Sequence, residues 1–140
     1  MSLVWLGSVQ YCAAKEPTAE ELFKQGIEAE EHHDPEKAIA LMERVIALRP
    51  HALNAYINVS VYYARDKRNL AKAESVIKRA LLIAPDDFLC QYQYAEVLAD
   101  EKKFLSAEHV LLKANAKTSA ERLKSDKLLK LITEYKSTKK

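Results

Sequence analysis

A pattern of small and apolar residues recurs along this chain at intervals of about 34 residues. Alanines at positions 38, 73 and 107 are separated by 35 and 34 residues. Four residues after each alanine comes a larger apolar side chain, at Met42, Ile77 and Leu111. One unit of this length cannot bury its apolar face alone, so repeats of this kind must stack on one another. The pattern therefore predicts a repeat protein.

The units of this repeat are predicted to be helical. The chain has only two Gly and four Pro, too few for a fold rich in tight β-turns. From Thr18 onward the apolar residues follow helical periodicity, interrupted by capping residues and prolines. Two antiparallel helices need small side chains where their backbones approach, which explains the recurring alanines. Seven helices are expected, over about 18–33, 35–48, 52–66, 69–84, 87–102, 105–116 and 119–135.

This arrangement resembles the tetratricopeptide repeat (TPR) family over about residues 18–119. The resemblance implies an all-α fold, a right-handed α-α superhelix of stacked helix pairs. Three repeats are expected at about 18–51, 52–86 and 87–118, followed by a capping helix and basic tail at 119–140. The sequence departs from the family pattern in two places. The third repeat has Gln91 at the position where the first two repeats have the large side chains Leu22 and Tyr56. The middle repeat has one extra residue around 66–69.

The resemblance also implies a binding groove, because in this family the first helix of each pair lines the concave surface. We expect the centre of this groove to be apolar and its rim charged, which suits an amphipathic helix or an extended apolar peptide. Coverage of the groove by the N-terminal segment or the last helix is an open alternative. The candidate partner-binding residues are Phe23, Ile27, Asn54, Ile57, Asn58, Val61, Arg65, Leu89, Tyr92 and Glu96.

One ligand class of the family is predicted to be excluded. Members that bind the acidic C-terminal tails of heat-shock chaperones use basic side chains and Asn on their first helices. At the corresponding positions this chain carries only one matching residue, Asn58. Without the lysines and arginine a terminal carboxylate would be poorly paired. The five positions read Phe23, Ile27, Asn58, Leu89 and Gln93.

Charge is unevenly distributed along the chain, although the net charge is only +2. Residues up to Leu48 include nine acidic and four basic side chains, whereas residues from Lys117 onward include three acidic and eight basic ones. The small net charge does not favour nucleic acid as a partner. Solvated helix faces often show such an asymmetry, but opposite charges at the two ends are also compatible with head-to-tail association. A self-assembling homo-oligomeric scaffold without a groove ligand is therefore the alternative function.

Residues 1–17 form an apolar segment that precedes the repeats. It is interpreted either as a packing helix or as the remnant of an export signal, because it is apolar but has no basic start. No apolar run in the chain reaches the ~18–20 residues that span a bilayer. The compartment stays open between the cytoplasm and an exported, periplasmic location.

Catalytic and metal-binding patterns are weak throughout the sequence. His32 and His33 with Glu28 do not supply the three or four convergent ligands of a zinc site. No Gly-rich phosphate loop is present, and Cys12 and Cys90 have no CxxC spacing. We therefore predict no enzyme activity, no cofactor and no metal, but a scaffold or adaptor that binds a protein or peptide.

Overall fold

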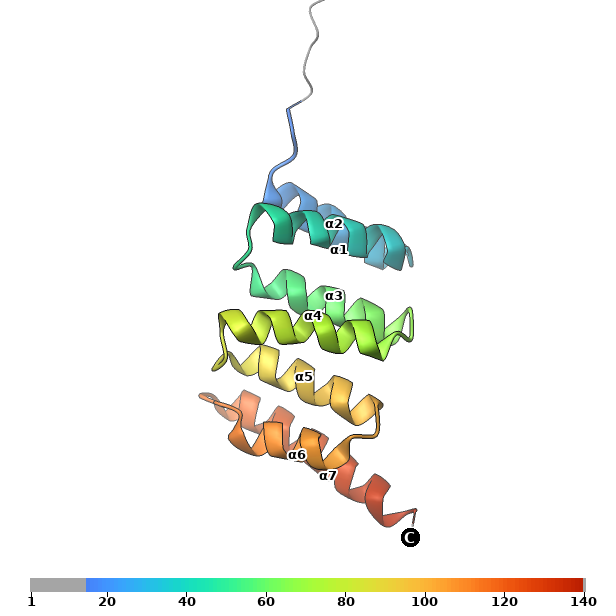
Figure 1. Cartoon of the computed structure of the whole chain (residues 1–140), viewed down its shortest axis with the longest axis vertical. Coiled ribbons are helices and arrows are strands. Elements are labelled where there is room, and N and C mark those ends of the chain that lie inside the picture. The colour runs from blue at the N-terminus through green and yellow to red at the C-terminus, as the bar shows by residue number, and fades with distance from the viewer. Residues whose placement is uncertain (1–14, 140) are drawn as a thin grey trace, which may run out of the picture.

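The computed structural model describes residues 15–139, which form seven α-helices and no strand. The helices stack in the order of the sequence, so that the first and last lie at opposite ends of an elongated molecule (Figure 1). This confirms the all-α helix-pair solenoid expected from the sequence. The helices are α1 (Ala19–Glu31), α2 (Pro35–Leu48), α3 (Leu53–Arg65), α4 (Leu70–Ile83), α5 (Phe88–Asp100), α6 (Phe104–Lys113) and α7 (Ser119–Ser137).

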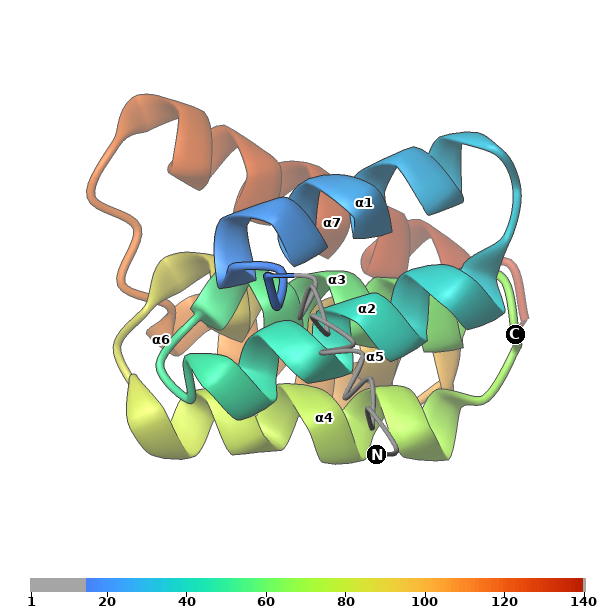
Figure 2. The same ribbon diagram turned by 90° about the horizontal axis from the view of Figure 1, so that it is seen from above.

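Consecutive helices form antiparallel pairs, α1 with α2, α3 with α4, and α5 with α6. Seen along the stack, α1 and α7 lie on one side of the molecule and α4 lies on the other (Figure 2). α7 packs against both α5 and α6, and its side chain Ile132 is buried with Leu98 and Leu111. The last helix therefore closes the apolar core at the end of the stack.

Small residues lie where the paired helices approach most closely. Ala38, Ala73 and Ala107 are fully buried. The Ser60 hydroxyl of α3 donates a hydrogen bond to the backbone carbonyl of Ala73 in α4 at 3.1 Å. In the first pair, a Cβ added to Gly26 would lie 2.8 Å from the terminal methyl of Met42. The spacing of small residues in the sequence thus marks the helix contacts of the structure.

The turn inside each repeat contains one residue in the left-handed backbone conformation. His33, Arg68 and Lys102 each adopt a left-handed φ, of 59°, 48° and 62°. Each directly precedes the N-cap residue of the next helix, which is Asp34, Asn69 or Lys103. The turn after α3 is one residue longer than the other two, which places the extra residue of the middle repeat in a turn rather than in a helix.

Gln91 makes the same hydrogen bond as the tyrosine that it replaces. The Tyr56 hydroxyl donates to the carbonyl of Pro50 at 3.0 Å, and the Gln91 side-chain amide donates to the carbonyl of Pro85 at 2.9 Å. The Gln91 amide oxygen also accepts a hydrogen bond from the backbone N–H of Asn115 at 2.9 Å. The polar substitution therefore retains the contact to the preceding loop and adds one to the loop after α6.

Helix α6 ends earlier than the sequence indicated, just before the hydrogen bond between Asn115 and Gln91. The expected helix 105–116 is wrong at both ends, because α6 begins at Phe104 and ends at Lys113. Ala114 has extended backbone angles, φ −62° and ψ 135°. Helical periodicity continues beyond Lys113, but the tertiary hydrogen bond from Asn115 to Gln91 holds the chain in a loop there.

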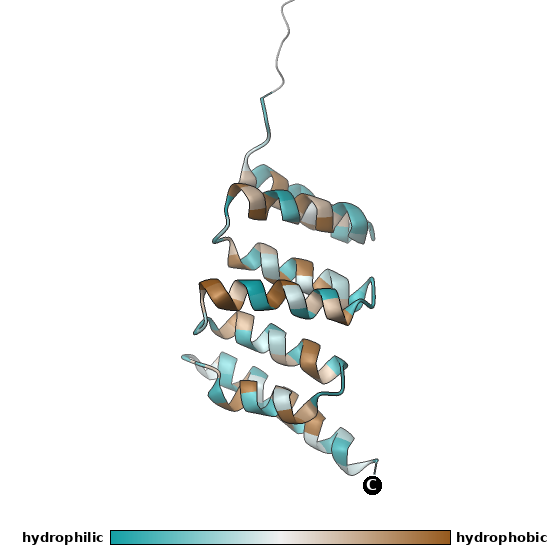
Figure 3. Ribbon diagram, in the orientation of Figure 1, coloured by the Kyte–Doolittle hydropathy of each residue, from teal (hydrophilic) through white to brown (hydrophobic). Residues whose placement is uncertain are grey.

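Two large apolar side chains, on α4 and α6, are exposed outside the hollows described below. The C-terminal end of α4 is among the most apolar parts of the ribbon in Figure 3. Leu82 in this stretch is 86% exposed, and Leu105 on α6 is 76% exposed. Neither lines any of the hollows described below. These two residues therefore supply control positions on the outside of the stack.

Candidate functional site

Three adjoining hollows lie along the face formed by α1, α3 and α5, and we call them together the groove. Their volumes are about 950, 330 and 290 Å³. Shared lining residues join them, since Phe23 and Leu89 line the first and second and Glu96 lines the second and third. All ten candidate residues from the sequence line at least one hollow: Phe23, Ile27, Asn54, Ile57, Asn58, Val61, Arg65, Leu89, Tyr92 and Glu96.

The first and largest hollow has apolar side chains from α1 and α5. Phe23 and Ile27 are half-buried, and Leu89 is 43% exposed. The volume of about 950 Å³ is at the upper end of the ~300–1,000 Å³ typical of ligand clefts. Sequence reasoning missed the part of this hollow that comes from the α2–α3 connection and the start of α3, namely Arg49, His51, Ala52 and Leu53.

Four of the charged side chains that line the first hollow form ion pairs within the chain. The Arg49 guanidinium forms an ion pair with the Glu20 carboxylate, and the Lys24 amine lies 3.8 Å from the Glu28 carboxylate. Hydrogen bonds from its own backbone N–H and from Arg49 lower the pKa of Glu20. An apolar occupant would consequently meet an apolar floor and a rim that carries two ion pairs and two further acidic side chains, Glu31 and Asp87.

The second hollow is bordered by the last helix. Lys124 of α7 lines it together with Ile57, Asn58 and Tyr92, and the Lys124 amine lies 5.7 Å from the centre of the Tyr92 ring. Leu128 of α7 lines the third hollow. The last helix thus forms one wall of the groove at α5.

Glu96 lies between the second and third hollows and is half-buried. Burial raises the pKa of this carboxyl, and the negative charge of Asp100 raises it further. The Tyr92 hydroxyl and the Lys124 amine act in the opposite direction. Burial beside Glu96 also raises the pKa of Tyr92 to about 12. Glu96 is therefore a carboxylate held in a partly desolvated part of the groove.

We expect Glu96→Gln to stabilise the protein slightly at pH 7. A carboxyl whose pKa is higher in the folded state destabilises folding once pH exceeds the unfolded-state pKa, whereas Gln is neutral at every pH. The difference in the free energy of unfolding should shrink as pH falls through the raised folded-state pKa, and it should be lost below about 4, where the carboxyl is protonated in both states. Urea denaturation at pH 7 and pH 4 measures this. A less stable variant at pH 7 would show that the Glu96 charge is needed, through Lys124.

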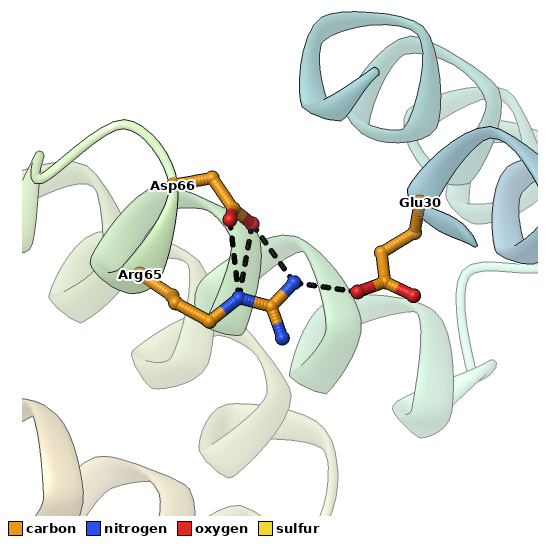
Figure 4. A network of polar contacts seen from close by, with 3 residues as sticks. All are labelled: Glu30, Arg65 and Asp66. Carbon is orange, nitrogen blue, oxygen red and sulfur yellow. Dashed lines mark hydrogen bonds and ion pairs between the residues drawn. The ribbon is translucent and has the colours of Figure 1, made fainter. Parts of the chain in front are cut away.

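Arg65 closes the far end of the groove within a three-residue ion cluster (Figure 4). Its guanidinium donates to the Glu30 carboxylate of α1 at 2.7 Å and to the Asp66 carboxylate at 3.0 Å. These hydrogen bonds, with Asp66 contributing most, raise the pKa of Arg65. The cluster joins the C-terminal ends of α1 and α3. The one arginine among the ten candidate residues therefore has its charge balanced by its own chain.

The cysteine of the described residues, Cys90, is part of the packed interior. Cys90 is fully buried at the start of α5, and desolvation raises its pKa to about 12, so its thiol stays protonated at neutral pH. Among residues 15–139, no three His, Cys, Asp or Glu side chains converge as metal ligands would. Within the same range, none of the helices combines the length and apolar character needed to cross a bilayer. Cys12 and the rest of the segment 1–14 lie outside the described residues.

Comparison with known proteins shows likeness in structure but none in sequence. No protein-family model matches the chain, and no curated protein matches it either. The first TPR domain of human RPAP3 superposes with a TM-score of 0.73, at 17% identity over 86% of this chain and 94% of that one. The TPR2B domain of yeast Sti1, in its complex with pHsp70, gives 0.71 at 20% identity over 84% and 97%.

A bacterial structure gives a similar match. The Yersinia enterocolitica type III secretion chaperone SycD, in complex with a peptide of the translocator YopD, superposes with a TM-score of 0.70. Its identity is 15% over 84% of this chain and 93% of that one. The TM-scores establish a shared fold. With three helix pairs, a closing helix and small residues at the helix contacts, this chain has a TPR-like fold.

Proposed function

We propose that this chain is a protein-interaction module that holds an extended or helical apolar peptide in the groove. The observation that carries the proposal is the first hollow, with its volume of about 950 Å³ and its apolar floor of Phe23, Ile27 and Leu89. Burial of one large apolar side chain contributes about 1.5–3 kcal/mol, so two or three anchors suffice for useful affinity. Binding, rather than catalysis, is the activity that such a surface supports.

The structural neighbours support the same class of function. SycD is in complex with a translocator peptide, and the first TPR domain of Spaghetti (RPAP3) is bound to the HSP90 peptide SRMEEVD. In this chain, however, Arg65 is paired with Glu30 and Asp66, and Phe23 and Leu89 are apolar where a carboxylate would need cations. We therefore infer an apolar ligand rather than an acidic C-terminal tail.

The test begins with peptides selected from a random displayed library against the intact chain. We expect the double variant Phe23→Ala/Leu89→Ala to bind these peptides at least about tenfold more weakly, since each tenfold loss corresponds to about 1.4 kcal/mol and anchor side chains commonly contribute more than that. Fluorescence anisotropy of labelled peptides measures the affinity. Circular dichroism verifies that each variant is folded.

The matched control is Leu82→Ala/Leu105→Ala, which removes two exposed apolar side chains outside the groove. Its affinity should equal that of the intact chain. Equal weakening by both double variants, or none by the groove variant, would move the binding site away from the groove. Selection of peptides that depend on a free terminal carboxylate would contradict the apolar ligand class.

A further inference from the structure

We propose that the groove binds a cationic peptide, whose apolar anchor fills the first hollow and whose Lys or Arg, about 16 Å further along, pairs with Glu96 and Asp100 in the third hollow. This inference rests on the proposed function, because it names the charge and the spacing of the same groove's ligand. Three observations support it: the direction of the groove, two carboxylates without an ion pair, and the excess of acidic side chains along the groove.

The three hollows follow one another along the axes of α3 and α5. On α3, Leu53 lines the first hollow, Ile57 the second and Val61 the third. On α5, the lining advances in the same direction, from Leu89 in the first hollow to Asp100 in the third. These two residues are eleven positions apart, which corresponds to about 16 Å along a helix. A peptide bound along the groove therefore meets an apolar hollow at one end and acidic side chains at the other.

Three charged side chains line the third hollow: Arg65, Glu96 and Asp100. Arg65 already forms ion pairs with Glu30 and Asp66, at 2.7 and 3.0 Å. Among residues 15–139, no basic side chain forms an ion pair with Glu96 or Asp100. The third hollow consequently presents two negative charges to a ligand.

The folded chain compensates these two charges only in part. Partial burial raises the pKa of both carboxyls, and the charge of Asp100 raises the pKa of Glu96 further. Tyr92 and Lys124 oppose the effect on Glu96 without offsetting it, and no cation opposes the effect on Asp100. Like charges one helical turn apart also repel each other. A cation from a bound peptide would relieve both costs, which gives this pair a role in binding that it lacks in folding.

The groove as a whole also favours a cationic ligand. Six of the side chains that line its three hollows are acidic and four are basic. Three of the basic ones, Lys24, Arg49 and Arg65, already pair with carboxylates of this chain. In the part of the chain that the structure describes, Glu31 and Asp87 of the first hollow form no ion pair. The charges of the groove therefore attract a basic peptide and repel an acidic one.

Synthetic amphipathic helical peptides test the proposal. The probe peptide has Phe and Leu anchors at its centre and one lysine about 11 residues to each side, so that either direction of binding brings a lysine to the third hollow. One comparison peptide has Gln in place of both lysines, and another has both lysines one turn from the anchors. We expect the probe to bind the intact chain about five- to tenfold more tightly than either comparison peptide, measured by fluorescence anisotropy.

Glu96→Gln/Asp100→Asn should abolish this preference, because it removes both charges with little change in side-chain shape. The matched control is Glu36→Gln/Glu43→Gln, which removes two carboxylates of α2 that line none of the three hollows. The control should keep the preference for the probe. Circular dichroism verifies that both variants are folded.

Equal affinity of the intact chain for the three peptides would overturn the proposal, as would failure of the probe to bind. Equal loss of the preference in both double variants would also overturn it, since long-range attraction would then select the lysines. If Phe23→Ala/Leu89→Ala weakens binding but the lysines have no effect, the cation site is refuted and the proposed function stands. If the preference depends on Glu96 and Asp100 but Phe23→Ala/Leu89→Ala leaves affinity unchanged, the cation site is supported and the proposed function is refuted.

Discussion

Replacing Ile77 with alanine is expected to lower the free energy of unfolding by about 2–5 kcal/mol. Ile77 is fully buried in α4, the helix that packs against both α3 and α5. Removing three carbons there loses the transfer free energy of the side chain and leaves a cavity that the surrounding helices fill only in part. The loss is a large fraction of the ~5–15 kcal/mol that stabilises a typical domain. Urea denaturation followed by circular dichroism measures it.

Leu82→Ala is the matched control, because it truncates a large side chain on the same helix at a position that is 86% exposed. Its effect should stay within about 0.5 kcal/mol. Equal destabilisation by both substitutions would mean that helix propensity, rather than burial between repeats, determines the stability of α4. No destabilisation by Ile77→Ala would show that α4 does not pack between α3 and α5 as described.

Enlarging Ala73 to leucine is expected to destabilise the protein by about 1–3 kcal/mol or more, although leucine and alanine are both good helix formers. The hydrogen bond from the Ser60 hydroxyl to the Ala73 carbonyl shows that α3 and α4 are in close contact at this point. Extra methyl groups can be accommodated only if the two helices separate. The same urea titration measures the effect.

Ala71→Leu provides the control for this prediction, since Ala71 is exposed on the same helix. It should change the free energy of unfolding by no more than about 0.5 kcal/mol. If Ala73→Leu were tolerated equally well, the recurring alanines at 38, 73 and 107 would reflect helix propensity rather than close helix packing. The repeat pattern would then lose its structural explanation.

Most of the fold could be predicted because it is encoded by short-range signals. Asp34 and Asn69 cap helices where the sequence placed helix starts, and both accept hydrogen bonds from the backbone three residues later. The recurring alanines predicted the helix contacts because close approach excludes any larger side chain. The end of α6 could not be predicted, because it coincides with a hydrogen bond between Asn115 and Gln91, residues that are distant in the sequence.

The groove was predictable in outline and less so in detail. Helical spacing placed Ile57 and Val61 on the same face of α3, and both line hollows on that face. The contribution of Leu53 to the first hollow depends on how the α2–α3 connection packs, which no local pattern reports. The raised pKa of Glu96 likewise depends mainly on its burial, which results from tertiary packing rather than from the local sequence. The binding role of all ten residues stays a prediction until the groove variants are measured.

The sequential stacking of the helices has a consequence for how the protein is made. Each helix packs mainly against its neighbours in the chain, so a newly synthesised helix pair finds the surface of the preceding pair already present. On a ribosome, α1 and α2 can pair before α5 has been translated, and later repeats can add to that template in order. Such growth keeps the sequence distance between contacting residues short, which favours fast folding. Translation and folding of this protein can therefore proceed in the same direction, from the N-terminus to the closing helix.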